Sequence, residues 1–175
     1  LQVGDEVGDR VSNTIFNGAG ATIEGRGQNA SNTPGAGDGI RFNNGADGAI
    51  SETDIVNSGL ITTDSNQGTA AGIRFADGLA AEGRVLNTST GTIEGARNGL
   101  YIGQAEHDLD VLNFGTIQSG SRAINIDGTG VNLVNSGDIL GTADQRNGTV
   151  YADGTADDFS VRNLAGGAID AGEGN

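Results

Sequence analysis

The sequence contains no cysteine, tryptophan, methionine or lysine, and only one proline and one histidine in 175 residues. The lack of cysteine excludes disulfide bridges and cysteine-ligated metal sites. All nine basic residues are arginines, and the 23 acidic residues give a formal net charge of −14. A chain with this charge lacks the basic surface that nucleic-acid-binding proteins present to phosphate, so we expect no nucleic-acid partner.

Long hydrophobic runs are also missing. No stretch approaches the roughly 20 apolar residues of a membrane-spanning helix, and the first residues show neither the basic start nor the apolar core of a signal peptide. Glycine accounts for 32 residues, and each glycine inside a helix costs about 1 kcal/mol relative to alanine. The sequence therefore predicts an all-β chain without a membrane span.

One short pattern returns six times along this chain. Each copy consists of an apolar residue, a variable residue and an asparagine. The asparagines are Asn17, Asn57, Asn87, Asn113, Asn135 and Asn163. A glycine and then an isoleucine follow each of them, although successive asparagines are 40, 30, 26, 22 and 28 residues apart. Unequal distances between copies of a constant short pattern are typical of solenoid coils that carry loops of different lengths.

A second apolar block lies between successive copies and alternates apolar, variable and apolar. These blocks occupy residues 40–42, 73–75, 100–102, 124–126 and 150–152. Alternation with a period of two indicates a strand with one buried face. Each repeat then comprises three short strands, which cannot bury a face alone. We therefore expect a parallel β-helix of about six coils, in which each strand pairs with its copies in the adjacent coils.

The repeated asparagines are predicted to form one column, with a strand spacing of about 4.8 Å between neighbours. An asparagine at a turn can bond the turn backbone and the same asparagine of the next coil, which forms a ladder. The glycine two or four residues later is expected to supply the positive φ of a tight corner. Because the pattern continues to residue 169 without a cap, we expect residues 1–175 to be a single solenoid domain. That domain would be either a fragment of a longer surface protein or a protomer that stacks on neighbours.

Residues 55–61, 111–117 and 133–139 read Ile-Val-Asn-Ser-Gly-Leu-Ile, Val-Leu-Asn-Phe-Gly-Thr-Ile and Leu-Val-Asn-Ser-Gly-Asp-Ile. These segments resemble the coils of bacterial autotransporter passenger domains and of other large bacterial surface adhesins, and the resemblance covers residues 11–171. It implies a right-handed parallel β-helix displayed outside a Gram-negative cell. The resemblance indicates architecture rather than activity, since such passengers include adhesins, stalks, proteases and esterases.

The densest ionisable cluster is 106–110, which holds the only histidine, His107. One histidine without a second ligand at i+3 or i+4 does not make a transition-metal site. No Gly-x-Ser-x-Gly motif accompanies it, which argues against a serine hydrolase. We interpret the cluster as a solvated loop before a strand. The sequence therefore predicts no catalytic residue, no metal site and no cofactor.

Carbohydrate chemistry stays open, because polysaccharide lyases and glycosidases also use this architecture. Glycosidases need two carboxylates at a set separation. The candidate carboxylates are Asp54, Asp108, Asp110, Asp157 and Asp158. Residues 35–40 partly resemble the calcium-binding turn of secreted nonapeptide repeats, but the copy is single, so an ordinary Asp-Gly turn is the competing interpretation. Weak calcium binding at acidic corners also stays open.

Alternation predicts two outward-facing columns. The middle residues of the second blocks form an exposed column of mostly planar groups: Arg41, Arg74, Tyr101, Asn125 and Tyr151. These groups could bind a ligand by stacking on sugar rings or by meeting acidic partners, or they could stack only on one another. The residues before the asparagines form an apolar stripe: Phe16, Val56, Leu86, Leu112 and Val134. Loops such as 24–39 could cover this stripe, another protomer could contact it, or a bend could turn it inward.

The function that these patterns favour is structural. We expect a non-enzymatic adhesin, stalk or fibre segment at a bacterial cell surface, stiffened by parallel ladders and made specific by its unequal loops. Its expected partners are other copies of itself, neighbouring segments of a surface protein, and host or matrix glycans. The alternative is a carbohydrate-active enzyme or a glycan-binding module.

Overall fold

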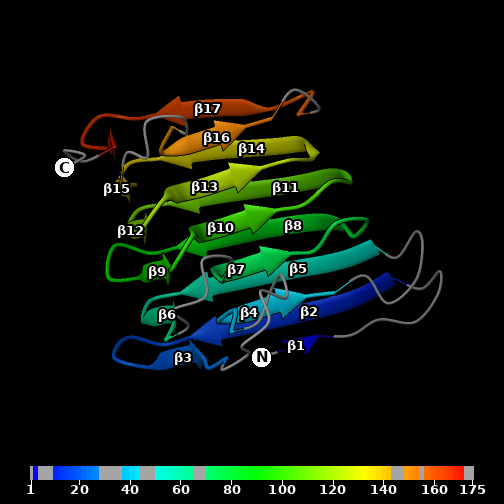
Figure 1. Cartoon of the computed structure of the whole chain (residues 1–175), viewed down its shortest axis with the longest axis horizontal. Helices are drawn as coiled ribbons and strands as arrows, with labels where there is room; N and C mark the ends of the chain where they lie inside the picture. Colours follow the sequence, from blue (N-terminus) through cyan, green and yellow to red (C-terminus); the bar gives the residue numbers. More distant parts are fainter. Residues whose placement is uncertain are drawn as a thin grey trace.

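The computed structural model describes residues 2–3, 10–27, 37–43, 50–64, 70–142, 148–153 and 156–171. These residues form 18 strands and no helix, and the strands assemble into three six-stranded sheets. The chain passes through the sheets in the same order in every turn and so builds a right-handed parallel β-helix of about six coils (Figure 1). The predicted fold class is confirmed.

Each sheet collects one strand from every coil. Sheet A contains β1 (Gln2–Val3), β4 (Ile40–Phe42), β7 (Ala71–Phe75), β10 (Asn98–Ile102), β13 (Arg122–Ile126) and β16 (Val150–Ala152). Sheet B contains β2 (Arg10–Asn17), β5 (Ile50–Asn57), β8 (Ala80–Asn87), β11 (Glu106–Asn113), β14 (Thr129–Asn135) and β17 (Ser160–Asn163). Sheet C contains β3 (Thr22–Gly25), β6 (Leu60–Thr63), β9 (Thr92–Gly95), β12 (Thr116–Ser119), β15 (Asp138–Leu140) and β18 (Ala168–Asp170). Sheet A thus holds the second apolar blocks, and sheet B holds the strands that end at asparagine.

The interior consists of stacked columns of apolar side chains. Ile61, Ile93 and Ile117 of sheet C are in register and fully buried. Phe42 and Phe75 of sheet A stack with ring centroids 4.9 Å apart and planes 6° from parallel. Full burial of side chains of this size contributes roughly 1.5–3 kcal/mol each, so a core of few aromatics is sufficient when every coil repeats it. No helix among the described residues could span a membrane.

The repeated asparagines lie in one column at the ends of the sheet B strands. Along this column each Nδ2 donates to the Oδ1 of the next asparagine, and the donor–acceptor distance is 2.8 Å in every step from Asn17 to Asn163. The same amide also reaches backbone carbonyls, as Asn113 does at Asp138 (3.1 Å) and Gly115 (3.2 Å). The ladder therefore satisfies amides that would otherwise be buried without partners.

The glycines beside this ladder have a role that differs from the predicted one. They are Gly59, Gly91, Gly115, Gly137 and Gly167, and none of them has a positive φ. The corner residues with positive φ are instead Gly20 and Gly166. A Cβ on Gly115 would lie 2.2 Å from the carbonyl oxygen of Gly91 and 2.3 Å from that of Thr88. The expectation of positive φ is wrong for these five glycines, which are required because backbones of successive coils touch there.

Candidate functional site

The outward column of sheet A is present, but part of it is covered. Arg41, Arg74, Tyr101, Asn125 and Tyr151 are register partners in successive strands. Arg74 is 7% exposed and Asn125 is 2% exposed, so their predicted exposure is wrong. The reason is that polar side chains from the adjoining turns fold over this face of the sheet.

Arg74 is held by a buried carboxylate from the turn before β4. Its Nε lies 2.8 Å from Oδ2 of Asp38, whose Oδ1 accepts the backbone N–H of Ala71 at 2.7 Å. Arg41 approaches the same carboxylate at 3.4 Å. Removing one partner of a buried ion pair leaves an uncompensated charge, so Arg74 and Asp38 fix two coils against each other. Asp38 also belongs to the segment that resembles a calcium turn, and here its carboxylate binds arginines.

Tyr101 is locked between a cation and an acid. The guanidinium carbon of Arg74 lies 4.4 Å from the centre of the Tyr101 ring, a cation–π arrangement. The Tyr101 hydroxyl donates to Oδ1 of Asp77 at 2.9 Å. Burial of the ring and then the Asp77 hydrogen bond raise the pKa of Tyr101 far above its ordinary value. The phenol therefore stays protonated and remains a donor to Asp77.

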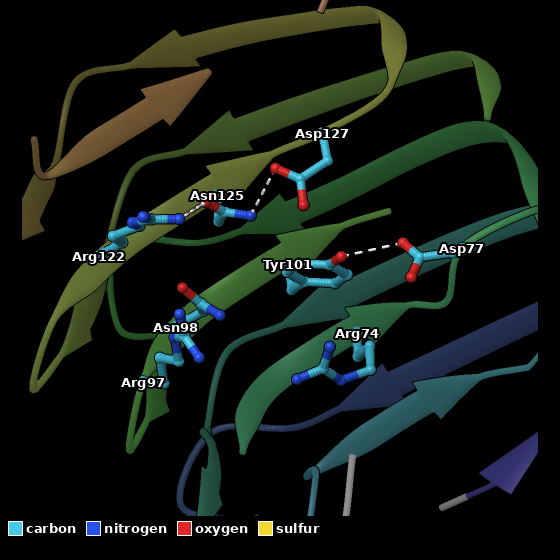
Figure 2. A pocket seen from close by; sticks show the side chains of 8 residues that line it. All are labelled: Arg74, Asp77, Arg97, Asn98, Tyr101, Arg122, Asn125 and Asp127. Carbon is cyan, nitrogen blue, oxygen red and sulfur yellow. Dashed lines mark hydrogen bonds between the residues drawn. The ribbon is translucent and has the colours of Figure 1, made fainter. Parts of the chain in front are cut away.

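A second chain of contacts continues on the next coils (Figure 2). The guanidinium carbon of Arg122 lies 3.9 Å from the centre of the Tyr151 ring. The Arg122 Nη1 donates to Oδ1 of Asn125 at 2.5 Å. The Asn125 Nδ2 in turn donates to Oδ1 of Asp127 at 2.9 Å. One face of each tyrosine in the column is thus covered by a guanidinium of the same chain. A sugar ring could stack on those faces only by displacing an arginine.

These contacts enclose a groove on the outer face of sheet A, which we call the sheet A groove. It has a volume of about 290 Å³, at the lower end of the range for small-molecule clefts. Its lining consists of Arg74, Asp77, Arg97, Asn98, Tyr101, Arg122, Asn125 and Asp127. Figure 2 shows Arg97, Asn98 and Arg122 where the strands begin, and the two aspartates at the opposite end. The groove is therefore cationic at one end and anionic at the other.

Sequence reasoning missed Arg97, Asn98 and Arg122. The alternation argument considered only the middle residue of each second block, whereas these three lie three or four residues before that residue. The available signal was a basic residue shortly before the block in two successive coils.

The five candidate carboxylates do not converge on one site. Asp54 and Asp108 help to line a second, more open groove on sheet B. Asp54 is paired with Arg84 (2.7 Å between Oδ1 and Nε), and Asp110 accepts from Asn132 at 3.0 Å. The other two, Asp157 and Asp158, lie just before β17. No group of three or more histidine or acidic side chains that could hold a metal ion occurs among the described residues.

His107 is not in a solvated loop, so that interpretation is wrong. It belongs to β11 and is buried, because it occupies an inward position of the alternating strand. Its Nδ1 accepts the backbone N–H of Ala81 at 3.0 Å, and its Nε2 lies 3.0 Å from the Gly103 carbonyl oxygen. Since the Ala81 N–H can only donate, Nε2 must carry the proton that bonds Gly103. Both ring nitrogens of the neutral imidazole are satisfied.

This arrangement predicts acid sensitivity. Burial lowers the pKa of His107 below its ordinary value of 6.5, and protonation would also break the Ala81 bond. The unfolded chain therefore binds the proton first, and stability falls as pH decreases from about 6.5 toward the folded pKa, by at most about 1.4 kcal/mol per pH unit. Urea unfolding at pH 7.5 and 5.5 should show this loss in the wild type. His107→Gln should show less of it, and an equal loss in both proteins would contradict the assignment.

The apolar stripe on sheet B faces outward. Its members are register partners along the sheet, and Phe16 is 73% exposed whereas Val56, Leu86, Leu112 and Val134 are partly buried. Buried and outward positions alternate along the whole of β11, which excludes an inward bend at Leu112. Of the loop 24–39 that could cover the stripe, residues 28–36 lie outside the described residues.

The fold places this chain in the class of right-handed parallel β-helix proteins, and one of its sheets carries a polar groove. No protein-family model, no curated protein and no solved structure matches it. A function must therefore be argued from the coils and from the contacts of the groove.

Proposed function

We propose that this chain is a rigid, non-enzymatic β-solenoid that serves as a structural or adhesive segment of a bacterial cell-surface protein, of the kind seen in autotransporter passengers. The observation that carries the proposal is the ladder of asparagine amides, which runs without a break from Asn17 to Asn163. Together with three parallel sheets it ties every coil to the next. Such a rod suits a stalk, a fibre segment or an adhesin that holds its loops away from the cell.

The apolar columns of the interior continue into the last described coil. Val161 and Ile169 are 40% and 38% exposed, whereas their register partners Leu133 and Ile139 are completely buried. The exposed pair continues two interior columns, so a further coil on this end would bury it. A neighbouring segment of a surface protein or a second copy could supply that coil. The apolar stripe, in which Phe16 is the most exposed member, offers a separate, lateral surface.

Light scattering and small-angle X-ray scattering test this proposal. We expect elongated particles whose mass increases with protein concentration. Val161→Glu should prevent the increase, because it places a charge on the axial contact. Leu112→Glu is the matched control on the lateral stripe and should leave axial growth unchanged. Loss of association in Leu112→Glu but not in Val161→Glu would shift the contact to the stripe, and a compact monomer at all concentrations would contradict axial stacking.

A glycan-binding module is the second candidate, and one observation favours it. The sheet A groove is lined by Asn98, whose buried amide oxygen Oδ1 has no hydrogen-bond partner in the part of the chain that the structure describes. The enzyme alternative has no comparable support, because the candidate carboxylates are distributed over two regions and Asp54 is already paired with Arg84. We therefore propose binding rather than catalysis.

A further inference from the structure

We propose that the sheet A groove binds a hydroxylated carboxylate, specifically a single hexuronate residue of an otherwise neutral glycan. Arg97 and Arg122 would hold its carboxylate, and a neighbouring hydroxyl would donate to Oδ1 of Asn98. This inference deepens the glycan-binding candidate and rests on it, but it does not depend on axial stacking of the solenoid.

The two arginines lie on adjacent coils, and both line the groove. The backbone N–H of Arg122 donates to the carbonyl oxygen of Arg97 at 3.1 Å, so the two residues are neighbours across the sheet. The Arg97 side chain is exposed and makes no hydrogen bond or ion pair to the described part of the chain. The Arg122 guanidinium is already oriented by Tyr151 and Asn125. A planar guanidinium matches a carboxylate, and prior orientation reduces the entropy lost on binding.

Asn98 specifies what must accompany the carboxylate. The residue is 3% exposed and pairs in register with Arg122. Asn98 lines the groove, and its buried Oδ1 has no hydrogen-bond partner among the described residues, although more than about 90% of buried polar groups in proteins are satisfied. An unsatisfied buried acceptor requires a donor, which a carboxylate, sulfate or unprotonated phosphate oxygen cannot supply. The ligand should therefore carry a hydroxyl beside its acidic group.

The opposite end of the groove limits the charge of the ligand. Asp77 and Asp127 already accept from Tyr101 and Asn125, and their remaining lone pairs can accept further hydroxyl donors. They would repel a second anionic group, as would the net charge of −14. A sugar with one carboxylate and several hydroxyls fits this distribution better than a polyuronate or a sulfated chain.

Isothermal titration calorimetry with methyl glucuronide at low salt tests the proposal, with methyl glucoside, lactate, acetate and sulfate as comparison probes. We expect methyl glucuronide to bind at least tenfold more tightly than the glucoside, acetate or sulfate. Arg97→Gln and Asn98→Leu should each weaken this binding at least tenfold. Arg84→Gln, which removes an arginine on sheet B, is the matched control and should bind as the wild type does. Tighter binding of the glucuronide than of lactate identifies a sugar, rather than a small hydroxy acid, as the ligand.

Three results would overturn the proposal. Binding of acetate or sulfate as tight as that of the glucuronide would show an anion site without hydroxyl recognition. An equal loss in Arg84→Gln would show a general charge effect, and absence of glucuronide binding would remove the site. Because Asn98 is buried, circular dichroism must show that the Asn98→Leu variant is folded. If that variant does not fold, Arg97→Gln still tests the proposal, because Arg97 is exposed. Scattering of Arg97→Gln should match the wild type, which separates this failure from failure of the stacking proposal.

Discussion

Asn113→Leu is expected to lower the free energy of unfolding by about 3 kcal/mol or more. The substitution removes the acceptor of the Asn87 Nδ2 and the donor to Oδ1 of Asn135, both at 2.8 Å. It also removes donors to the carbonyl oxygens of Asp138 and Gly115. Asn113 is completely buried, and each buried polar group left without a partner costs about 1–3 kcal/mol. Leucine has a similar size, so the loss measures the amide rather than a cavity.

Urea unfolding followed by circular dichroism measures this effect, and the ladder supplies its own control. Asn163 occupies the same position in the last described coil, where it accepts from Asn135 and donates to Gly167, but it is exposed to water. Asn163→Leu should therefore cost less than about 1 kcal/mol, because water replaces the lost partners. Equal losses of unfolding free energy in the two variants would contradict this explanation, because they would show that the cost does not depend on the burial of the asparagine.

Gly115→Ala should be comparably destabilising, by about 3 kcal/mol, and for a steric reason. The added Cβ would lie 2.2 Å and 2.3 Å from two backbone carbonyl oxygens of the preceding coil, those of Gly91 and Thr88. Neither oxygen can rotate away as a flexible side chain would, so the backbone itself must move. Inserting a methyl group into a packed interior typically costs about 1–3 kcal/mol. Here the added methyl group would also push the backbones of two neighbouring coils apart.

Gly166→Ala is the matched control for this substitution. Gly166 has a φ of +90°, and no heavy atom beyond its chain neighbours lies within 4 Å of the position that a Cβ would occupy, whereas Gly115 has the opposite combination. Alanine there should cost only the strain of a left-handed backbone, about 1–2 kcal/mol. Thermal and urea unfolding of both variants separate the two causes. A larger loss at Gly166 would restore the positive-φ explanation for the corner glycines.

Much of the architecture could be predicted because every coil repeats the same sequence pattern and the same arrangement of strands. Parallel strands in register place equivalent residues directly above one another, so a pattern read once, such as apolar–x–Asn, describes a whole column. The pairing of Asn57 with Asn87 and of Asn87 with Asn113 follows from that translation. For the same reason alternation predicts an outward position for the residue before each asparagine, and the burial pattern of β11 agrees with it.

The errors occur at residues whose environment comes from a different part of the coil. The burial of Arg74 depends on Asp38, which lies 36 residues away in sequence, and nothing in the local alternation indicates that contact. The acidic neighbours of His107 favour a loop, yet its hydrogen-bond partners are the backbones of Ala81 and Gly103. Arg97 and Asn98 precede the apolar block of sheet A, so the alternation of that block does not include them, and they become part of a groove only beside Arg122.

The sequence by itself determined the number of coils, the three strands in each and the column of asparagines, because these depend on a period that survives variation in loop length. Only the tertiary structure decided which polar groups are satisfied. Stacking brings side chains from the corners of adjacent coils together, and whether an arginine meets an aspartate, an aromatic ring or nothing depends on distances that no linear pattern contains. The unpartnered amide oxygen of Asn98 beside Arg97 and Arg122 arises from that stacking.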